Sequence, residues 1–134
     1  MDDKGSLTGK TVLITGAARR VGAAIARELH SAGANLVVHY RSSAKDAQAL
    51  VGDLGRARPK SAASFQADLL DLARLPALCE FAVQSFGTLD VLINNASTFY
   101  PTPIGKITAE AWDDLLGSNL KVPLFLSQAV APAL

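Results

Sequence analysis

The chain has 134 residues, a formal net charge of +1 and a single cysteine, Cys79. This length corresponds to one ordinary domain that is large enough for a hydrophobic core. The near-neutral charge and the lack of a basic tail argue against nucleic acid or an anionic membrane as the main partner. One cysteine excludes a disulfide within the chain and a cysteine metal site, so we expect no metal.

The start of the sequence lacks the features of a signal peptide, because residues 1–5 are charged and have no apolar segment. No apolar run is long enough to span a bilayer. Together with the low cysteine content, these features predict a cytoplasmic protein.

Apolar strands and amphipathic helices alternate along the chain. In chain order, the predicted elements are strand Thr11–Thr15, helix Val21–Ala32, strand Asn35–Tyr40, helix Ser43–Leu54, strand Ser61–Ala67, helix Leu72–Phe86, strand Leu89–Asn94, loop Ser97–Ile107 and a helix from Ala109 with a break near Pro123. Gly33, Gly55 and Gly87 are expected to lie just beyond the ends of the first three helices.

Strands that are almost entirely apolar and alternate with helices are typical of a parallel sheet covered on both faces. Right-handed connections then predict a doubly wound α/β fold with strand order 3-2-1-4. Ligands of such sheets bind beyond the carboxyl ends of the strands. The polar residues that follow the four predicted strands are therefore expected to line one crevice.

The turn Thr15–Gly22 connects the first strand to the first helix. Gly16 permits a sharp exit from the strand, and Gly22 lets the helix pack close to the sheet. The backbone N–H groups of such a turn can bind phosphate. Arg19 and Arg20 reinforce this interpretation because a guanidinium binds phosphate with two hydrogen bonds. The turn predicts a phosphorylated ligand.

The end of the second strand indicates which dinucleotide binds. An acidic residue there would hold the ribose hydroxyl of NAD, but the sequence has Tyr40, Arg41, Ser42 and Ser43. A guanidinium and two hydroxyls favour the 2′-phosphate of NADP. In the alternative interpretation, Arg41 is a solvated surface charge and a serine only caps the next helix. Asp46 is expected to be a first-turn carboxylate of that helix.

Two further strand ends carry polar residues. Asp68 can accept a hydrogen bond from the adenine amine or cap a helix that begins at Leu69, and both interpretations stay open. Asn94 and Asn95 are expected to bond to backbone groups at the strand end. Ala96 has a small side chain, so a cofactor could lie flat against it.

These motifs together resemble the first half of a short-chain dehydrogenase/reductase. The resemblance rests on Thr15–Gly22, Asp68-Leu69, Asn94-Asn95-Ala96 and Asn119. The usual family turn is Thr-Gly-x-x-x-Gly-x-Gly, and here Arg20 replaces its second glycine. This departure, with the segments 39–43 and 95–103, resembles the pteridine reductase branch of the family.

The resemblance implies a role for each matching residue. Arg20 would contact the cofactor phosphates and reach the pterin edge, Ser97 would bond to the pterin head group, and Phe99 would stack on the pterin. Asn119 would position a water for proton relay. The implied cofactor-binding set is Gly16, Arg19, Arg20, Val21, Gly22, Tyr40, Arg41, Ser42, Ser43, Asp68, Leu69, Asn95, Ala96 and Ser97.

Alternative interpretations apply to several of these side chains. Phe99 could plug the end of the sheet. Asn119 could bond to the backbone in a kink before Pro123. Trp112 is expected in the core or in an interface, because the last helix is apolar on too many sides for a solvated helix. His30 and His39 are expected to be packed or bonded to the backbone, without a catalytic role.

The family's proton donor is a tyrosine followed by a lysine four residues later. Ala44 and Ile104 occupy that position after Tyr40 and Tyr100, so the pair is missing. We therefore expect residues 1–134 to be the amino-terminal portion of one Rossmann-type domain, inactive alone, from a protein that forms homo-oligomers through the last helix.

The predicted function of the complete protein is NADPH-dependent reduction of a pterin or a dihydrofolate-like compound. One alternative is a short-chain reductase of carbonyl substrates, such as a 3-oxoacyl thioester or a sugar. Another, from a different class, is a non-catalytic NADP-binding module.

Overall fold

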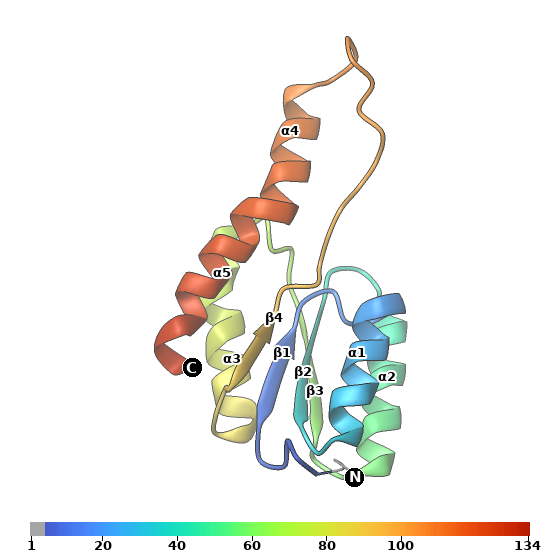
Figure 1. Ribbon diagram of the computed structural model, residues 1–134, viewed down its shortest axis with the longest axis vertical. Coiled ribbons are helices and arrows are strands. Elements are labelled where there is room, and N and C mark those ends of the chain that lie inside the picture. Colours follow the sequence, from blue (N-terminus) through green and yellow to red (C-terminus); the bar gives the residue numbers. More distant parts are fainter. Residues whose placement is uncertain (1–4) are drawn as a thin grey trace.

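The chain folds as a parallel sheet with helices on both faces (Figure 1). The computed structural model describes residues 5–134. Four strands lie in the order β3-β2-β1-β4, and every neighbouring pair is parallel. This order confirms the predicted doubly wound arrangement. The strands are β1 (Thr11–Ile14), β2 (Asn35–Tyr40), β3 (Ala62–Gln66) and β4 (Val91–Ile93).

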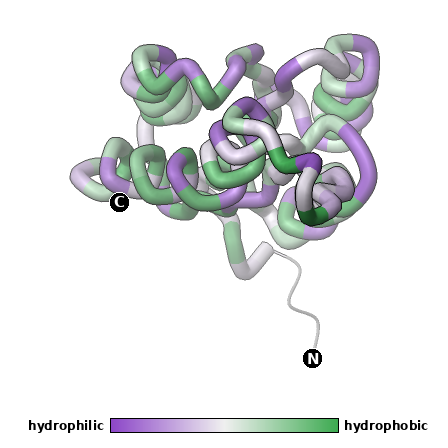
Figure 2. Tube along the Cα trace, turned by 90° about the horizontal axis from the view of Figure 1, so that it is seen from above, coloured by the Kyte–Doolittle hydropathy of each residue, from purple (hydrophilic) through white to green (hydrophobic). Residues whose placement is uncertain are grey.

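Helices form the outer layers. One face of the sheet is covered by α1 (Arg20–Ser31) and α2 (Ala44–Ala57), and the other by α3 (Leu75–Phe86) and α5 (Val122–Val130). The helix α4 (Ala109–Leu116) rises beyond the carboxyl edge of the sheet, beside the long connection that follows β4 (Figure 1). Figure 2 shows hydrophobic and hydrophilic stretches alternating along the helices, as expected when one helix face packs on a sheet.

The strands bury side chains on both faces of the sheet. In β1, Val12 and Ile14 pack with α1 and α2, whereas Leu13 packs with α3 and α5. In β2, Leu36 joins the first cluster and Val37 the second. Successive side chains of a strand point to opposite faces. Burial on both faces explains why these strands are continuous apolar runs in the sequence.

The second helix is longer than predicted. It passes Gly55 and ends at Ala57, where the Arg58 N–H donates to the Leu54 carbonyl. A Cβ at Gly55 would meet nothing within 4 Å, so this glycine is a solvated position inside the helix. Because a glycine there costs only about 0.5–1 kcal/mol relative to alanine, it does not stop the helix.

The fourth strand and the third helix are both shorter than predicted. Pairing of β4 covers Val91–Ile93, because the Asp90 carboxylate, at 2.9 Å, takes the Thr11 N–H that a strand carbonyl would otherwise accept. The predicted third helix begins with a 3-10 turn, Leu72–Arg74, before α3.

The predicted break near Pro123 is a π-helical turn, Gly117–Lys121, between α4 and α5. Proline has no N–H, so Pro123 cannot donate to the carbonyl of Asn119, four residues earlier. The Asn119 carbonyl therefore lacks the α-helical partner that another residue at this position would supply. No helix within residues 5–134 is both long and apolar enough to cross a membrane.

Two buried histidines connect neighbouring elements. His30 of α1 is 4 % exposed, and its Nε2 lies 2.7 Å from the Ser61 hydroxyl oxygen. His39 of β2 is 2 % exposed, and its Nε2 lies 2.8 Å from the Ala67 carbonyl oxygen. Both side chains are packed, and His39 has the predicted bond to the backbone.

Acid is expected to destabilise the fold through these two side chains. Burial lowers the pKa of both histidines below the ordinary 6.5; the Arg58 guanidinium lowers that of His30 further, and the Ala67 bond and the Asp68 charge partly oppose the effect at His39. The unfolded chain then takes up protons at a higher pH than the folded chain. The stability that depends on these groups is therefore complete above about pH 6.5 and is lost as the pH falls below it. Urea unfolding midpoints should be lower near pH 5 than near pH 8, whereas equal midpoints would contradict this account.

Candidate functional site

A cavity of about 540 Å³ opens at the carboxyl edge of the sheet. Segments that follow all four strands line it, so the crevice predicted from the strand order is present. Every residue of the predicted cofactor-binding set lies on its wall. The remaining lining residues are Ala18, His39, Ala67, Leu70, Thr98, Ser118 and Val122.

Most of these additional residues are chain neighbours of predicted ones. Ser118 and Val122 are different, because they come from the π-helical turn and the start of α5. The signal in the sequence was the kink expected near Pro123, which sets how this helix passes the end of the sheet.

The two glycines of the turn after β1 are required by close contacts. Gly16 has φ +59°, and a Cβ there would lie 2.9 Å from the Cα of Ala96. A Cβ on Gly22 would lie 2.6 Å from both the Asn95 side-chain nitrogen and the Gly16 carbonyl oxygen. Real Cβ atoms essentially never approach so closely, so only glycine lets α1 and the segment after β4 meet at this point.

Thr15 and Asn95 hold the ends of β1 and β4 together. The Thr15 hydroxyl accepts the N–H groups of Asn95 at 3.0 Å and Ala96 at 2.9 Å. The Asn95 amide donates to the carbonyls of Thr15 and Gly16, both at 3.1 Å. Asn94 differs from its prediction: its amide donates to the Ser127 hydroxyl of α5 at 3.2 Å, and it does not line the cavity. Successive residues of an extended chain point to opposite faces, which separates the two asparagines.

Arg20 adopts a left-handed backbone conformation, with φ +53°. This is the position where the family turn has its second glycine, which takes such a conformation without a steric penalty. A non-glycine residue pays roughly 1–2 kcal/mol for it. The preceding Arg19 lies 3.8 Å from Asp46, which is the predicted first-turn carboxylate of α2.

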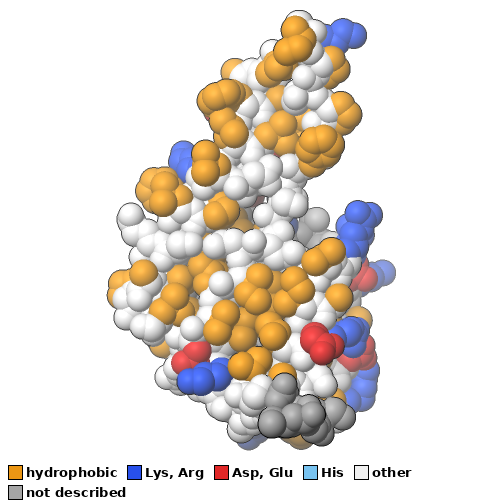
Figure 3. All heavy atoms as spheres, viewed as in Figure 1, with side chains coloured by type: hydrophobic (Ala, Val, Ile, Leu, Met, Phe, Trp, Pro, Cys, Tyr) orange, Lys and Arg blue, Asp and Glu red, His pale blue; other side chains and the backbone are white. Residues whose placement is uncertain are grey.

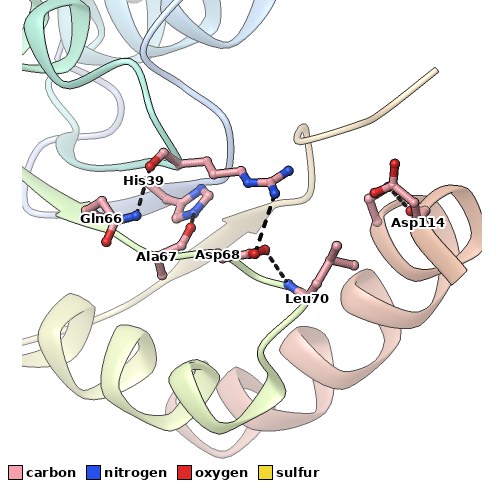
Figure 4. A network of polar contacts seen from close by, with 8 residues as sticks. His39, Gln66, Ala67, Asp68, Leu70 and Asp114 are labelled. Carbon is pink, nitrogen blue, oxygen red and sulfur yellow. Dashed lines mark hydrogen bonds and ion pairs between the residues drawn. The ribbon is translucent and has the colours of Figure 1, made fainter. Parts of the chain in front are cut away.

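The segments after β2 and β3 meet through Arg41 and Asp68 (Figure 4). The guanidinium of Arg41 lies 3.6 Å from the Asp68 carboxylate, and both side chains are about half exposed. The other carboxylate oxygen of Asp68 accepts the Leu70 N–H at 3.0 Å. Asp68 therefore closes a turn and caps no helix, because the next helical turn begins at Leu72 with Asp71 as its cap.

Ser43 occupies the N-cap position of α2, but its side chain makes no capping hydrogen bond within the described residues. The interpretation of this serine as a helix cap is therefore wrong. The Ser43 hydroxyl lines the cavity beside Arg41 and Ser42, where a ligand can reach it.

Phe99 and Asn119 are absent from the cavity wall. Phe99 is 89 % exposed, so it does not plug the end of the sheet. The Asn119 side chain accepts from the Thr98 N–H at 3.2 Å and donates to the Thr98 carbonyl at 2.7 Å. Asn119 is thus bonded to the backbone, and it ties the π-helical turn to the connection that carries Phe99.

Tyr100 is unsuited to the role of a proton donor with a lowered pKa. Desolvation raises its pKa, and the Asp114 carboxylate, which accepts from its hydroxyl at 3.0 Å, raises it further. A catalytic tyrosine requires the opposite shift, which a neighbouring cation provides.

A parallel sheet in this order, with a glycine turn that opens onto a crevice at the carboxyl edge, defines a nucleotide-binding α/β protein. The family model described as short chain dehydrogenase matches residues 10–134, and the chain belongs to this family. The resemblance found in the sequence is thereby confirmed.

Similar curated proteins include several reductases. Pteridine reductase 1 of Leishmania tarentolae is 38 % identical over 157 aligned positions, which cover 94 % of this chain and 54 % of that protein. A hydroxynaphthalene reductase-like protein of Metarhizium anisopliae is 35 % identical over 92 % of this chain and 46 % of its own length. An uncharacterized oxidoreductase of Methylorubrum extorquens is 38 % identical over 93 % of this chain and 50 % of its own length. The chain spans about half the length of these relatives.

Proposed function

We propose that this chain is the NADP(H)-binding part of a reductase that transfers a hydride to a pterin or a dihydrofolate-like ring. The observation that carries the proposal is Arg20, an arginine held in a left-handed conformation on the cavity wall. Backbone strain of this kind persists mainly at functional sites, so it supports a role for the side chain in binding. The similarity to pteridine reductase 1 supports the substrate class.

The residues of the cavity fit NADP(H) better than NAD(H). After β2 the wall presents Arg41, Ser42 and Ser43 and no carboxylate, which suits a 2′-phosphate and not a free ribose diol. Asp68 and Leu69 would bind adenine at the end of β3. When bound, NADPH supplies the hydride.

Three side chains are proposed to hold the substrate. Arg20 would bond to the edge of the pterin, and the Ser97 hydroxyl would bond to its head group. Phe99 presents a fully accessible ring two residues after Ser97, and its stacking on a flat heterocycle would orient that ring for hydride transfer.

The proton would reach the substrate through water held at Asn119. The side chain of Asn119 is occupied by Thr98, whereas Pro123 leaves the Asn119 carbonyl without its helical partner. We propose that this carbonyl binds the water. Because neither tyrosine of the chain has a lysine four residues later, the proton donor would be a side chain outside these residues, and the chain alone should bind nucleotide without turnover.

Oxidation of NADPH by the complete protein tests the substrate class. Dihydrobiopterin should be reduced, and an acetoacetyl thioester should be reduced slowly or not at all. The reverse preference would support a carbonyl reductase, an alternative in line with the hydroxynaphthalene reductase-like relative. Tight NADPH binding without turnover of any substrate would instead support a non-catalytic module.

Arg20→Gly is expected to separate stability from function. Glycine removes the left-handed strain, so the free energy of unfolding should rise or stay unchanged, by up to about 1 kcal/mol. The same change removes the guanidinium, so the affinity for NADPH and the kcat/KM for dihydrobiopterin should both fall. Urea unfolding and steady-state kinetics measure the two effects. A variant that is more stable and fully active would show that Arg20 has no binding role.

We also propose that the complete protein associates through the apolar face of α4 and α5. Hydrophobic side chains gather over the projecting α4 region (Figure 3). Trp112 is 64 % exposed, Leu120 65 % and Leu124 61 %, so the expectation that Trp112 lies in the core is wrong and the interface interpretation stays open. Trp112→Glu should shift the oligomer toward monomer in light scattering, whereas an unchanged mass would contradict this surface.

A further inference from the structure

His39 makes three hydrogen bonds to the segments that form the cofactor cavity. Its Nδ1 accepts the Gly16 N–H at 3.0 Å, and its carbonyl accepts the Ala17 N–H at 2.9 Å. Its Nε2 lies 2.8 Å from the Ala67 carbonyl oxygen, at the end of β3 (Figure 4). One residue of β2 thus bonds to the turn after β1 and to the segment after β3.

These partners determine the tautomer of the ring. A backbone N–H only donates, so Nδ1 must be the unprotonated acceptor. A carbonyl only accepts, so Nε2 must carry the hydrogen. Only the neutral ring with its proton on Nε2 satisfies both partners, and a second proton would place an N–H of His39 against the N–H of Gly16.

His39 also decides which N–H groups of the turn remain for a ligand. It takes those of Gly16 and Ala17. Within residues 5–134, those of Ala18 and Arg19 have no hydrogen-bond partner, and both residues line the cavity. The orientation of the free N–H groups therefore depends on the bonds that His39 makes to the first part of the turn.

We propose that His39 is a positioning residue that holds the turn after β1 and the segment after β3 in the arrangement that binds the dinucleotide, and that it does so only in its neutral form. This role rests on the proposed binding of NADP(H) in the cavity.

The environment of His39 is consistent with a neutral ring. Burial lowers its pKa, and the Ala67 bond and the Asp68 charge oppose this effect without cancelling it. The other titratable or charged side chains that line the cavity are Arg19, Arg20, Tyr40 and Arg41, and Arg41 is paired with Asp68.

Two substitutions separate the bonds of the ring. The side-chain oxygen of His39→Asn can replace Nδ1 and accept from Gly16, but asparagine is too short to reach Ala67. The side-chain nitrogen of His39→Gln can replace Nε2 and donate to Ala67, but it leaves the Gly16 N–H without an acceptor. His30→Asn is the matched control, because it removes a buried histidine that does not line the cavity.

Calorimetric titration with NADP⁺ near pH 8 compares the folded variants. His39→Gln should lose about three- to tenfold in affinity, corresponding to one hydrogen bond, and His39→Asn should lose less. His30→Asn should bind like the wild type. If His39→Gln does not fold, the loss in His39→Asn and the pH profile of the wild type still test the role.

The pH profile distinguishes positioning from a merely structural role. Wild-type affinity should fall as the pH drops from about 8 to about 5.5, and His39→Asn should lose this dependence. NAD⁺ serves as a second ligand, because it lacks the 2′-phosphate that itself titrates in this range. A wild-type profile that is flat with NAD⁺, or variants that bind like the wild type, would overturn the role of His39. No binding of NADP⁺ or NAD⁺ by the wild type at any pH would overturn the proposed function instead.

Discussion

Arg41→Ala is expected to weaken the binding of NADPH by roughly ten- to a hundredfold and that of NADH only slightly. A charge-assisted bond to a phosphate contributes about 1.5–3 kcal/mol, and NADH lacks the 2′-phosphate that would form it. In the structure the guanidinium lies on the cavity wall and has only a 3.6 Å contact with Asp68, so it can turn to a ligand. Calorimetric titration with each nucleotide measures the difference.

A matched control is Arg27→Ala. Arg27 pairs with Asp53 on the outer surface of the helix layer and does not line the cavity. This variant should bind both nucleotides like the wild type. Arg41→Lys should keep part of the preference, because an ammonium retains the charge but not the paired geometry. An equal loss of NADPH and NADH affinity in Arg41→Ala would show that Arg41 does not contact the 2′-phosphate.

Gly22→Ala is expected to destabilise the protein by about 1–3 kcal/mol, the usual cost of overpacking. The new Cβ would lie 2.6 Å from the Gly16 carbonyl oxygen and 2.8 Å from the Ala17 Cα, so α1 must move away from the turn. Because the same turn lines the cavity, NADPH affinity should fall as well. Urea unfolding and nucleotide titration of the same samples measure both effects.

Gly55→Ala is the matched control for this prediction. Gly55 also lies within a helix, but a Cβ there would meet nothing within 4 Å. Alanine should therefore stabilise the helix by about 0.5–1 kcal/mol and leave nucleotide binding unchanged. If Gly22→Ala were as stable as the wild type, the close packing of α1 on the turn would be refuted.

The sheet and its crevice were predictable because both follow from local patterns. Apolar runs such as Asn35–Tyr40 pack on both faces of the sheet, and the helices between them impose parallel strands. Once the order is set, the residues after each strand must meet at one edge. Gly16, Arg41 and Asn95 were placed on the cavity wall by this rule alone.

Details that depend on side-chain competition were not predictable. The sequence does not show that Asp68 bonds to Leu70 instead of capping a helix, since a carboxylate serves either partner equally well. It does not show that Asn94 turns to Ser127 while Asn95 lines the cavity, because strand boundaries determine which side each faces. The hydrogen bonds of His39 likewise depend on three chain segments that only the fold brings together.

The measurement that tests the central claim most directly is ³¹P NMR of NADP⁺ bound to the wild-type protein, because it reports the 2′-phosphate separately from the pyrophosphate. A free phosphate monoester takes up a proton near pH 6. If Arg41 and the two serines bind it, the 2′-phosphate of the bound nucleotide should shift its resonance and remain doubly charged to a clearly lower pH, because a guanidinium favours the charged form. A bound nucleotide whose 2′-phosphate titrates like that of free NADP⁺ would contradict the assignment of this cavity to NADP(H).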